Sequence, residues 1–476
     1  MAAGSKRKGS TIPLHASSPT VQTYGRRDTF SELTLPPVIP ASPPVNPNKP
    51  PYRVPLMSEI AALPWNGLTV ASTFSGCGGS SLGYKMAGYR VLWANEFIPA
   101  AQDTYRANHH GTILNTQDIR KVAAAQMLKE MGLKEGELDI LDGSPPCAAF
   151  STAGKREAGW GKVKAYSDTH QRVDDLFFEY IRLVRGIRPK VFVAENVSGL
   201  VKGTAKGYFL EILREMNASG YRVRCKVLDA QWLGVPQQRQ RTIFIGVRED
   251  IEREAEYPKP LGYYYTVADA LGGIGRAYRD DRGAFGNGGD ITDQPSPTIL
   301  SDSVGTHWMV EAANGLAPGP DGHHAMLPLD GKPFPTVQAS RPVQVAMPVP
   351  SAAVEPESDM TRYAVGREWD KLKPGEQSSR FFSLTRPDPS LPSPTVTQRG
   401  GDGSDASVTH PTERRKFTIA ELRRICAFPD DFILTGTYAQ QWERLGRAVP
   451  PVMMYHIARA IRDSVFNGGR TRDNAE

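Results

Sequence analysis

The chain has few cysteines and no long apolar run, and both shortages exclude whole classes of protein. Its four cysteines form no C-x-x-C pair, so the sequence predicts neither a disulfide framework nor a metal site of the zinc type. Unpaired cysteines fit a reducing compartment, and we expect a cytoplasmic location. No stretch is long and apolar enough to span a bilayer, and the N-terminal residues lack the apolar core of a secretory signal.

The composition is typical of a globular protein and is mildly basic. The 476 residues carry a formal net charge of +6 and include 45 glycines and 39 prolines. This length allows two or three domains with a sizeable core, and the charge is compatible with a polyanionic partner.

The first 66 residues differ from the rest, because they hold twelve of the 39 prolines and the basic run Lys6-Arg7-Lys8. Such a segment buries too little apolar surface to offset its ordering entropy, so we expect a disordered basic tail over residues 1–66. The alternative is a basic arm that lies along phosphates.

Residues 67–256 alternate between buried-strand and amphipathic-helix patterns. Strands are expected at 68–74, 89–94, 138–141, 191–194, 222–228 and 242–247. Helices are expected at 80–87, 98–109, 120–131, 176–187 and 209–216. This order predicts an α/β fold with a mostly parallel sheet and helices on both faces.

A glycine-rich turn, Ser75-Gly76-Cys77-Gly78-Gly79, follows the first expected strand and leads into a helix. Bare backbone in such a turn lets a nucleotide-type ligand approach closely. Glu96 lies about twenty residues further, just past the second strand, where an acidic side chain accepts hydrogen bonds from ribose hydroxyls. A charge at a helix N-terminus is the structural alternative for Glu96.

A stiff turn with two prolines, Ser144-Pro145-Pro146-Cys147, follows the third expected strand. Prolines fix φ and remove backbone donors, so Cys147 is held at the mouth of a strand, where α/β proteins carry reactive groups. The basic, glycine-rich residues 152–172 follow as an expected loop that could close over a polyanion.

Two further polar groups stand at strand ends. Glu195-Asn196-Val197 lies at the carboxyl end of the fourth expected strand, and Gln237-Gln238-Arg239-Gln240-Arg241 precedes the last one. Residues 257–412 then lose amphipathic periodicity, and the phrase Pro-x-Pro-Thr-Ile/Val recurs in them at 295–299, 333–337 and 392–396. Residues 413–466 predict two closing helices, at 418–424 and 446–466, before a flexible tail over 467–476.

The order of these motifs resembles the DNA (cytosine-5)-methyltransferases of prokaryotic or phage restriction-modification systems. The resemblance covers roughly residues 68–465, interrupted by the variable region. It implies a Rossmann-like S-adenosylmethionine-dependent methyltransferase domain at 67–256 and a smaller, irregular β-rich target recognition domain at 257–412. It also implies that the helices of 413–466 return to the catalytic domain.

The resemblance implies that carbon 5 of a flipped-out cytosine in double-stranded DNA is methylated through a covalent Cys147 adduct. Glu195 would hold the ring at nitrogen 3 and the amino group. Arg241 would hold the ring oxygen, and Arg239 a phosphate or the same pocket. The implied residues for S-adenosylmethionine are Phe74, Gly76, Gly78, Gly79, Glu96, Phe97, Asp118, Ile119, Pro146, Leu176 and Val449. No metal is implied.

Four positions depart from the family pattern: Ala148 follows the cysteine, Arg447 stands where asparagine is usual, and Cys426 and Ala427 replace more usual residues beside Phe428. Two alternatives remain, a tRNA cytosine-5 methyltransferase and a catalytically silent DNA-binding relative. A nucleotide-dependent dehydrogenase shares the glycine turn but does not explain Pro146-Cys147. We expect a monomer in the prokaryotic cytoplasm or nucleoid, without membrane association, with a separate restriction endonuclease as a conceivable companion.

Overall fold

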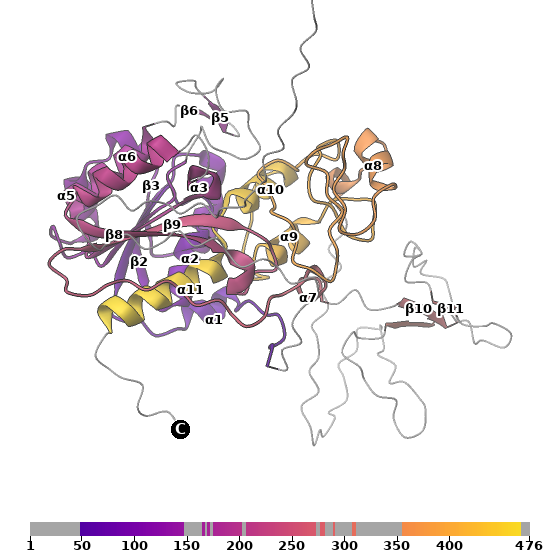
Figure 1. Ribbon diagram of the computed structural model, residues 1–476, viewed down its shortest axis with the longest axis horizontal. Helices are drawn as coiled ribbons and strands as arrows, with labels where there is room; N and C mark the ends of the chain where they lie inside the picture. Colours follow the sequence, from indigo (N-terminus) through magenta and orange to yellow (C-terminus); the bar gives the residue numbers. More distant parts are fainter. Residues whose placement is uncertain are drawn as a thin grey trace, which may run out of the picture.

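The computed structural model describes residues 48–146, 175–201, 206–272 and 355–467, together with five short strands between these ranges. A seven-stranded sheet in the order β3-β2-β1-β4-β7-β9-β8 forms its centre (Figure 1). The strands are β1 (Thr69–Thr73), β2 (Arg90–Asn95), β3 (Ile113–Asn115), β4 (Ile140–Gly143), β7 (Val191–Val197), β8 (Tyr221–Asp229) and β9 (Gln240–Arg248).

The sheet has a parallel part and an antiparallel part. Strands β3, β2, β1, β4 and β7 run parallel, whereas β9 runs antiparallel to both β7 and β8. The predicted α/β fold with a mostly parallel sheet is therefore confirmed. The order reverses beside β1, so the loops after β1 and β4 open at a switch point, where such sheets bind ligands.

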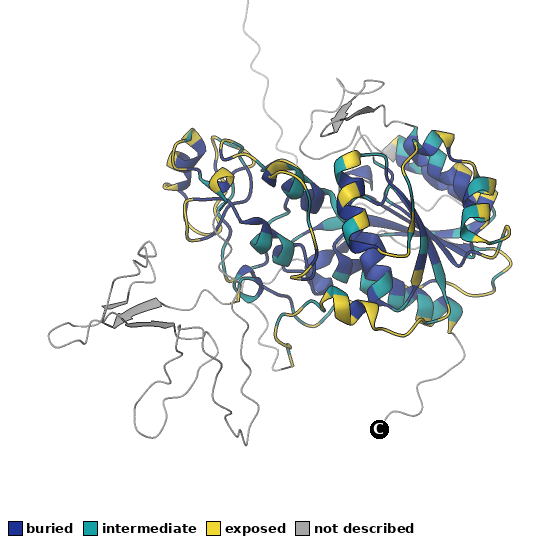
Figure 2. Ribbon diagram, turned by 180° about the vertical axis from the view of Figure 1, so that it is seen from behind, coloured by how far each residue is buried: buried dark blue, intermediate teal, exposed yellow. Residues whose placement is uncertain are grey.

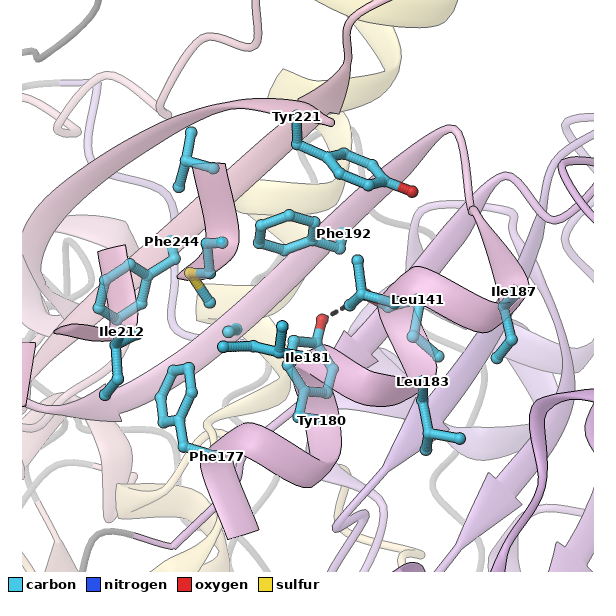
Figure 3. Close-up of a cluster of buried hydrophobic side chains, with 14 of the residues drawn as sticks. Leu141, Phe177, Tyr180, Ile181, Leu183, Ile187, Phe192, Ile212, Tyr221 and Phe244 are labelled. Atoms are coloured by element: carbon cyan, nitrogen blue, oxygen red, sulfur yellow. Dashed lines mark hydrogen bonds between the residues drawn. The ribbon is translucent and has the colours of Figure 1, made fainter. Parts of the chain in front are cut away.

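One face of the sheet is covered by α4 (Ala124–Met131), α5 (Leu176–Ile187) and α6 (Lys206–Asn217). Figure 3 shows the aromatic centre of this layer, where Phe177 and Tyr180 of α5 meet Phe192 and Phe244 of the sheet. The Tyr180 hydroxyl donates to the carbonyl oxygens of Leu141 and Val193, both at 2.9 Å. This buried phenol thus ties α5 to the two central strands at no cost in unsatisfied hydrogen bonds.

The other face carries α2 (Gly79–Met86) and α11 (Pro451–Ile461), from opposite ends of the chain. A Cβ atom built on Gly83 would lie 2.5 Å from the Cβ of Met454. The two helices therefore touch through backbone, which only glycine permits. Apart from the edge strand β3, the strands are mostly buried, and the helices expose their outer sides (Figure 2).

The closing helices number three rather than the two predicted. They are α9 (Ile419–Ile425), α10 (Tyr438–Arg447) and α11, which a π-helical turn at Arg462–Phe466 extends. Helix α10 was missed, and Gly446 lies in its last turn instead of opening the last helix. Thr437 caps it, since the threonine hydroxyl accepts from the amide of Gln440.

The expectation of a disordered tail through residue 66 is wrong for residues 48–66. The hydroxyl of Tyr52 donates to the carbonyl of Arg424 at 2.6 Å, and α1 (Met57–Ala61) buries Ile60. The Met57 amide donates to the Asp431 carboxylate. These contacts join residues 52–60 to the C-terminal helices. Residues 1–47 lie outside the described part of the chain.

The expected region 257–412 is described in pieces. Short strands β10 (Ala277–Asp280), β11 (Gly289–Asp290) and β12 (His307–Val310) form one antiparallel sheet. The two-stranded β5 (Lys164–Tyr166) and β6 (Thr169–Gln171) occur earlier, in the expected loop. Helices α7 (Val267–Ala270) and α8 (Ala364–Trp369) are short, and turns with isolated bridges make up most of 355–417.

The third proline phrase forms a strap between two parts of the molecule, which we define as residues 389–397. The Ser393 amide donates to the Pro236 carbonyl at 3.0 Å, and the Gln238 amide donates to the Ser393 carbonyl at 2.8 Å. On the other side, the Trp442 indole of α10 donates to the Thr397 carbonyl at 3.0 Å. The first two phrases lie outside the described residues.

Candidate active site

The glycine turn after β1 is held in an unusual backbone conformation. Gly76 and Gly78 have φ angles of +56° and +91°, and Phe74, a non-glycine residue, has φ of +53°. Left-handed φ at a phenylalanine is strained and persists only where the surrounding structure enforces it. Among the described residues, no heavy atom lies within 4 Å of a Cβ built on Gly76. The turn therefore leaves free space beside Gly76, as a bound ligand would require.

Glu96 follows β2 and braces this turn. Its carboxylate accepts the Gly76 amide at 2.7 Å through one oxygen and the Ile98 amide at 2.7 Å through the other. Burial raises the pKa of Glu96, and these two amide hydrogen bonds oppose that effect. Each oxygen keeps a lone pair for a further donor, and Phe97 beside it is half-buried.

Asp118 caps the short 3₁₀ turn Ile119–Lys121, because its side chain accepts the Arg120 amide at 3.0 Å. The Arg120 guanidinium pairs with Asp118 at 3.2 Å and with Asp175 at 2.5 Å. This ion pair links the loop after β3 to the start of α5. Sequence reasoning singled out Asp118 but not its two partners.

The apolar residues expected at the cofactor are divided between two cores. Phe74 packs against the cluster that contains Ile119 and Leu176, both nearly fully buried. Val449 belongs to the cluster on the opposite face. Its carbonyl oxygen lies 2.2 Å from a Cβ built on Gly79, so the first residue of α2 touches the turn before α11. Gly79 is thus required by chain packing.

The turn that leads to the expected nucleophile is anchored by the neighbouring strand. The side-chain amide of Asn196 donates to the Pro145 carbonyl at 3.0 Å. Pro146 is half-buried and is the last residue described there. Cys147, Ala148 and the expected loop up to residue 174 lie outside the described part, apart from the backbone of β5 and β6.

Glu195 and Arg241 form a buried ion pair on β7 and β9. Arg241 Nε lies 2.7 Å from Glu195 Oε1, and the two side chains are 12% and 10% exposed. Glu195 stands opposite Ile243 in the antiparallel register, two residues from Arg241. The two side chains are therefore diagonal neighbours on one face of the sheet. Burial lowers the pKa of Arg241, and the Glu195 charge counteracts this.

Arg239 is also buried, and it does not face solvent as a simple phosphate contact would. Its Nη1 donates to the Val396 carbonyl of the strap at 3.1 Å. Burial, followed by the charge of Arg241, lowers the pKa of Arg239 to about 9. Its Nε and Nη2 atoms have no hydrogen-bond partner among the described residues. Arg239 therefore ties the residues just before β9 to the strap.

Asp142 is a buried carboxyl group that sequence reasoning missed. It lies on β4, four residues before Pro146, and accepts from the Ser72 hydroxyl at 3.1 Å and the Tyr84 hydroxyl at 3.4 Å. Burial raises its pKa to about 7 against the effect of these hydroxyls. A charged residue inside an otherwise apolar strand was the available signal. Asp142 connects the strand before the nucleophile turn to α2.

In the described ranges, no group of three or more His, Cys, Asp and Glu side chains is arranged to hold a metal ion. Within the same ranges, no helix is both long enough and apolar enough to cross a membrane. The three described cysteines, Cys77, Cys225 and Cys426, are buried thiols.

Comparison with known proteins adds independent information about this site. The model of the family described as C-5 cytosine-specific DNA methylase matches residues 68–293 and 333–463. The chain is 30% identical over 397 residues to the type II methyltransferase M1.HphI of Haemophilus parahaemolyticus, covering 83% of this chain and 86% of that protein. It is 28% identical over 415 residues to M.NgoPII of Neisseria gonorrhoeae, covering 86% and 99%.

A solved structure agrees at the level of the fold. A prophage-encoded protein of E. coli, described as a DNA modification methyltransferase, superimposes with a TM-score of 0.54 at 21% identity. The match covers 84% of this chain and all of that one.

Proposed function

The chain belongs to the C-5 cytosine-specific DNA methylase family, and from that premise we propose how its own residues methylate carbon 5 of cytosine in DNA. The activity is that of a DNA (cytosine-5)-methyltransferase, as in type II modification enzymes. The observation that carries the residue assignment is the Glu195–Arg241 pair. Glu195 lies on β7, the strand whose Asn196 anchors the Pro145-Pro146 turn just before Cys147.

Cys147 is the nucleophile in this proposal. Carbon 5 of cytosine is a weak nucleophile, so the Cys147 thiolate adds to carbon 6 and leaves an enamine that is nucleophilic at carbon 5. Carbon 5 then takes the methyl group. A base, for which a water molecule suffices, then removes the proton from carbon 5. The double bond between carbons 5 and 6 reforms, and the Cys147 thiolate leaves.

Glu195 and Arg241 bind and polarise the base. The Glu195 carboxyl group contacts nitrogen 3 and the amino group, which draws electron density from carbon 6 during attack. Arg241 donates to the ring oxygen and keeps Glu195 oriented through the 2.7 Å ion pair. Since both side chains are buried, these interactions act in a low dielectric and are stronger than in water.

The family uses S-adenosylmethionine as methyl donor, and the residues around the glycine turn fit that molecule. Free space beside Gly76 suits its methionine part, and the Glu96 carboxylate has acceptor capacity left for ribose hydroxyls. Phe74 would hold the adenine, and Asp118 would accept from the adenine amine. Bound there, S-adenosylmethionine would supply an electrophilic methyl group for carbon 5.

Double-stranded DNA is the proposed substrate form, with the target cytosine flipped out of the helix into the pocket beside Cys147. Residues 257–412, apart from the strap and α7, read the sequence through the major groove. The family match is interrupted at 294–332, inside this region. We propose a monomer that protects DNA from a separate endonuclease in a prokaryotic cell.

Bisulfite sequencing of a plasmid from a methylation-free host that expresses this chain tests the proposal. A short motif in which one cytosine resists conversion, and which disappears with Cys147→Ser, is expected. Complete bisulfite conversion of the cytosines in the plasmid from cells with the wild-type protein would contradict the proposal. It would favour the tRNA methyltransferase or the silent DNA-binding relative, and Arg447→Asn would be the first variant to test for activity.

A further inference from the structure

The imidazole of His109 lies directly beneath the glycine turn and has no role in the mechanism above. His109 ends α3 (Pro99–Asn108) and is 2% exposed. A Cβ atom built on Gly78 would lie 2.0 Å from its Nε2 and 2.5 Å from its Cδ2. The ring therefore occupies the space that any side chain at Gly78 would need.

The ring is fixed on its other sides by aromatic packing. It stacks on Tyr105, with centroids 4.3 Å apart, and meets the edge of Phe432 at 6.3 Å. The Tyr105 hydroxyl donates to Ser81 Oγ of α2 at 3.0 Å. Asn108 exchanges hydrogen bonds with the backbone of Ile433, at 2.7 and 2.8 Å. These contacts hold the His109 ring in a fixed position against the glycine turn.

The polar state of the ring is unusual for a buried histidine. Neither ring nitrogen makes a hydrogen bond of normal geometry with a described residue. Burial, then the charges of Lys85 and His110, lowers the pKa of His109 well below its usual value. The imidazole is therefore neutral and acts through its shape and its contact with the backbone of the turn.

We infer that His109 is a positioning residue for the glycine turn. Its ring fixes the position of the Gly78 backbone and thereby keeps open the space beside Gly76 for the methyl donor. The inference rests on the proposed cofactor site. It also separates two glycines of the motif: Gly76 is needed for the ligand, whereas Gly78 is needed for His109.

A double-mutant cycle on the full chain tests this, with S-adenosylhomocysteine binding measured by calorimetry. His109→Ala should weaken binding by about 10-fold, and Gly78→Ala by about 100-fold because it adds a clash to backbone strain. In the double variant the clash is gone. The combined loss should then be at least about 10-fold smaller than the product of the single losses. A loss equal to that product, or unchanged binding in His109→Ala, would overturn the inference.

Controls distinguish positioning from general unfolding. Gly111 has φ of +81° and no heavy atom of a described residue within 4 Å of a built Cβ, so Gly111→Ala adds similar strain elsewhere and should leave affinity unchanged. His109→Asn leaves a smaller cavity than alanine and should give an intermediate loss if the protein remains folded by thermal melting. Steady-state kinetics of His109→Ala give a further readout. KM for the methyl donor should rise, while kcat at saturation changes less than about two-fold.

A separate arm tests the cofactor site itself. If Glu96→Gln also leaves S-adenosylhomocysteine binding unchanged, the proposed cofactor site is wrong and the positioning role falls with it. If Glu96→Gln weakens binding but His109→Ala does not, only the positioning role is wrong.

Discussion

The two halves of the proposed site are built by different means. Around β1 and β2, ligand space comes from backbone: left-handed glycines, a strained Phe74 and amides that converge on the Glu96 carboxylate. Around β7 and β9, it comes from buried charged side chains, with Glu195 and Arg241 paired and Arg239 bonded to the strap. The first half should be sensitive to added atoms, and the second to lost charges.

The largest expected effect is at Cys147, the proposed nucleophile. Cys147→Ser should reduce methyl transfer below detection, because a serine hydroxyl at neutral pH is a far weaker nucleophile than a thiolate. Calorimetry should show unchanged S-adenosylhomocysteine binding. Measurable turnover of the serine variant would mean that the covalent step uses another residue.

The charge-built half is tested by Glu195→Gln, for which kcat should fall by about 10²- to 10⁴-fold. The same change leaves Arg241 buried without its partner, so folding stability should fall by about 3 kcal/mol. The matched double variant Glu195→Gln/Arg241→Met should recover much of that stability in a denaturant titration without recovering turnover. Recovery of both would reduce the pair to a structural role.

The backbone-built half is tested by Glu96→Gln. An amide can replace only part of the carboxylate's acceptor role, so KM for the methyl donor should rise by about 10-fold, with kcat at saturation little changed. Asp103→Asn, an exposed change on the neighbouring helix, is the control. A fall in kcat without a change in KM would place Glu96 outside the binding site.

Asp142 stands where the two halves meet, and its titration should appear in stability. A folded-state pKa near 7, above the unfolded value of about 3.9, means that the folded protein holds a proton that the unfolded chain releases. Stability should therefore fall between about pH 4 and pH 7, by about 4 kcal/mol, and then level off. Asp142→Asn should lack this fall in melts across that pH range. A parallel pH dependence in both proteins would contradict the assignment.

The smallest effect is expected from the N-terminal segment. Deleting residues 1–47 should leave turnover and melting temperature nearly unchanged, whereas deleting residues 1–62 removes the Tyr52 hydrogen bond and the buried Ile60. The longer deletion should cost about 2 kcal/mol from lost burial alone. Equal melting temperatures for the two deletions would show that residues 48–62 add no stability.

The alternating patterns predicted six of the seven strands of the sheet, because buried strands and amphipathic helices have distinct periods. They missed the edge strand β3, whose three residues are too few to show a period. Helix α10 was missed although Thr437 and Gln440 form a capping box, a local signal that was present and overlooked. The resemblance assigned both Glu195 and Arg241 to the cytosine ring, and the ion pair between them was not predicted. The roles of His109 and Asp142 could not be predicted, since each depends on contacts between segments that lie far apart in the sequence.

The strap has a practical consequence for engineering specificity. Its residues hydrogen-bond to the turn before β9, to α10 and to α7, whose Val267 and Ala268 amides donate to Leu391 and Pro389 at 2.9 Å. Exchanging all of residues 257–412 for those of a relative would replace the strap and α7 together with the recognition residues. Chimeras with junctions near residues 272 and 355 would keep the strap and its native hydrogen bonds and exchange only the residues between the junctions.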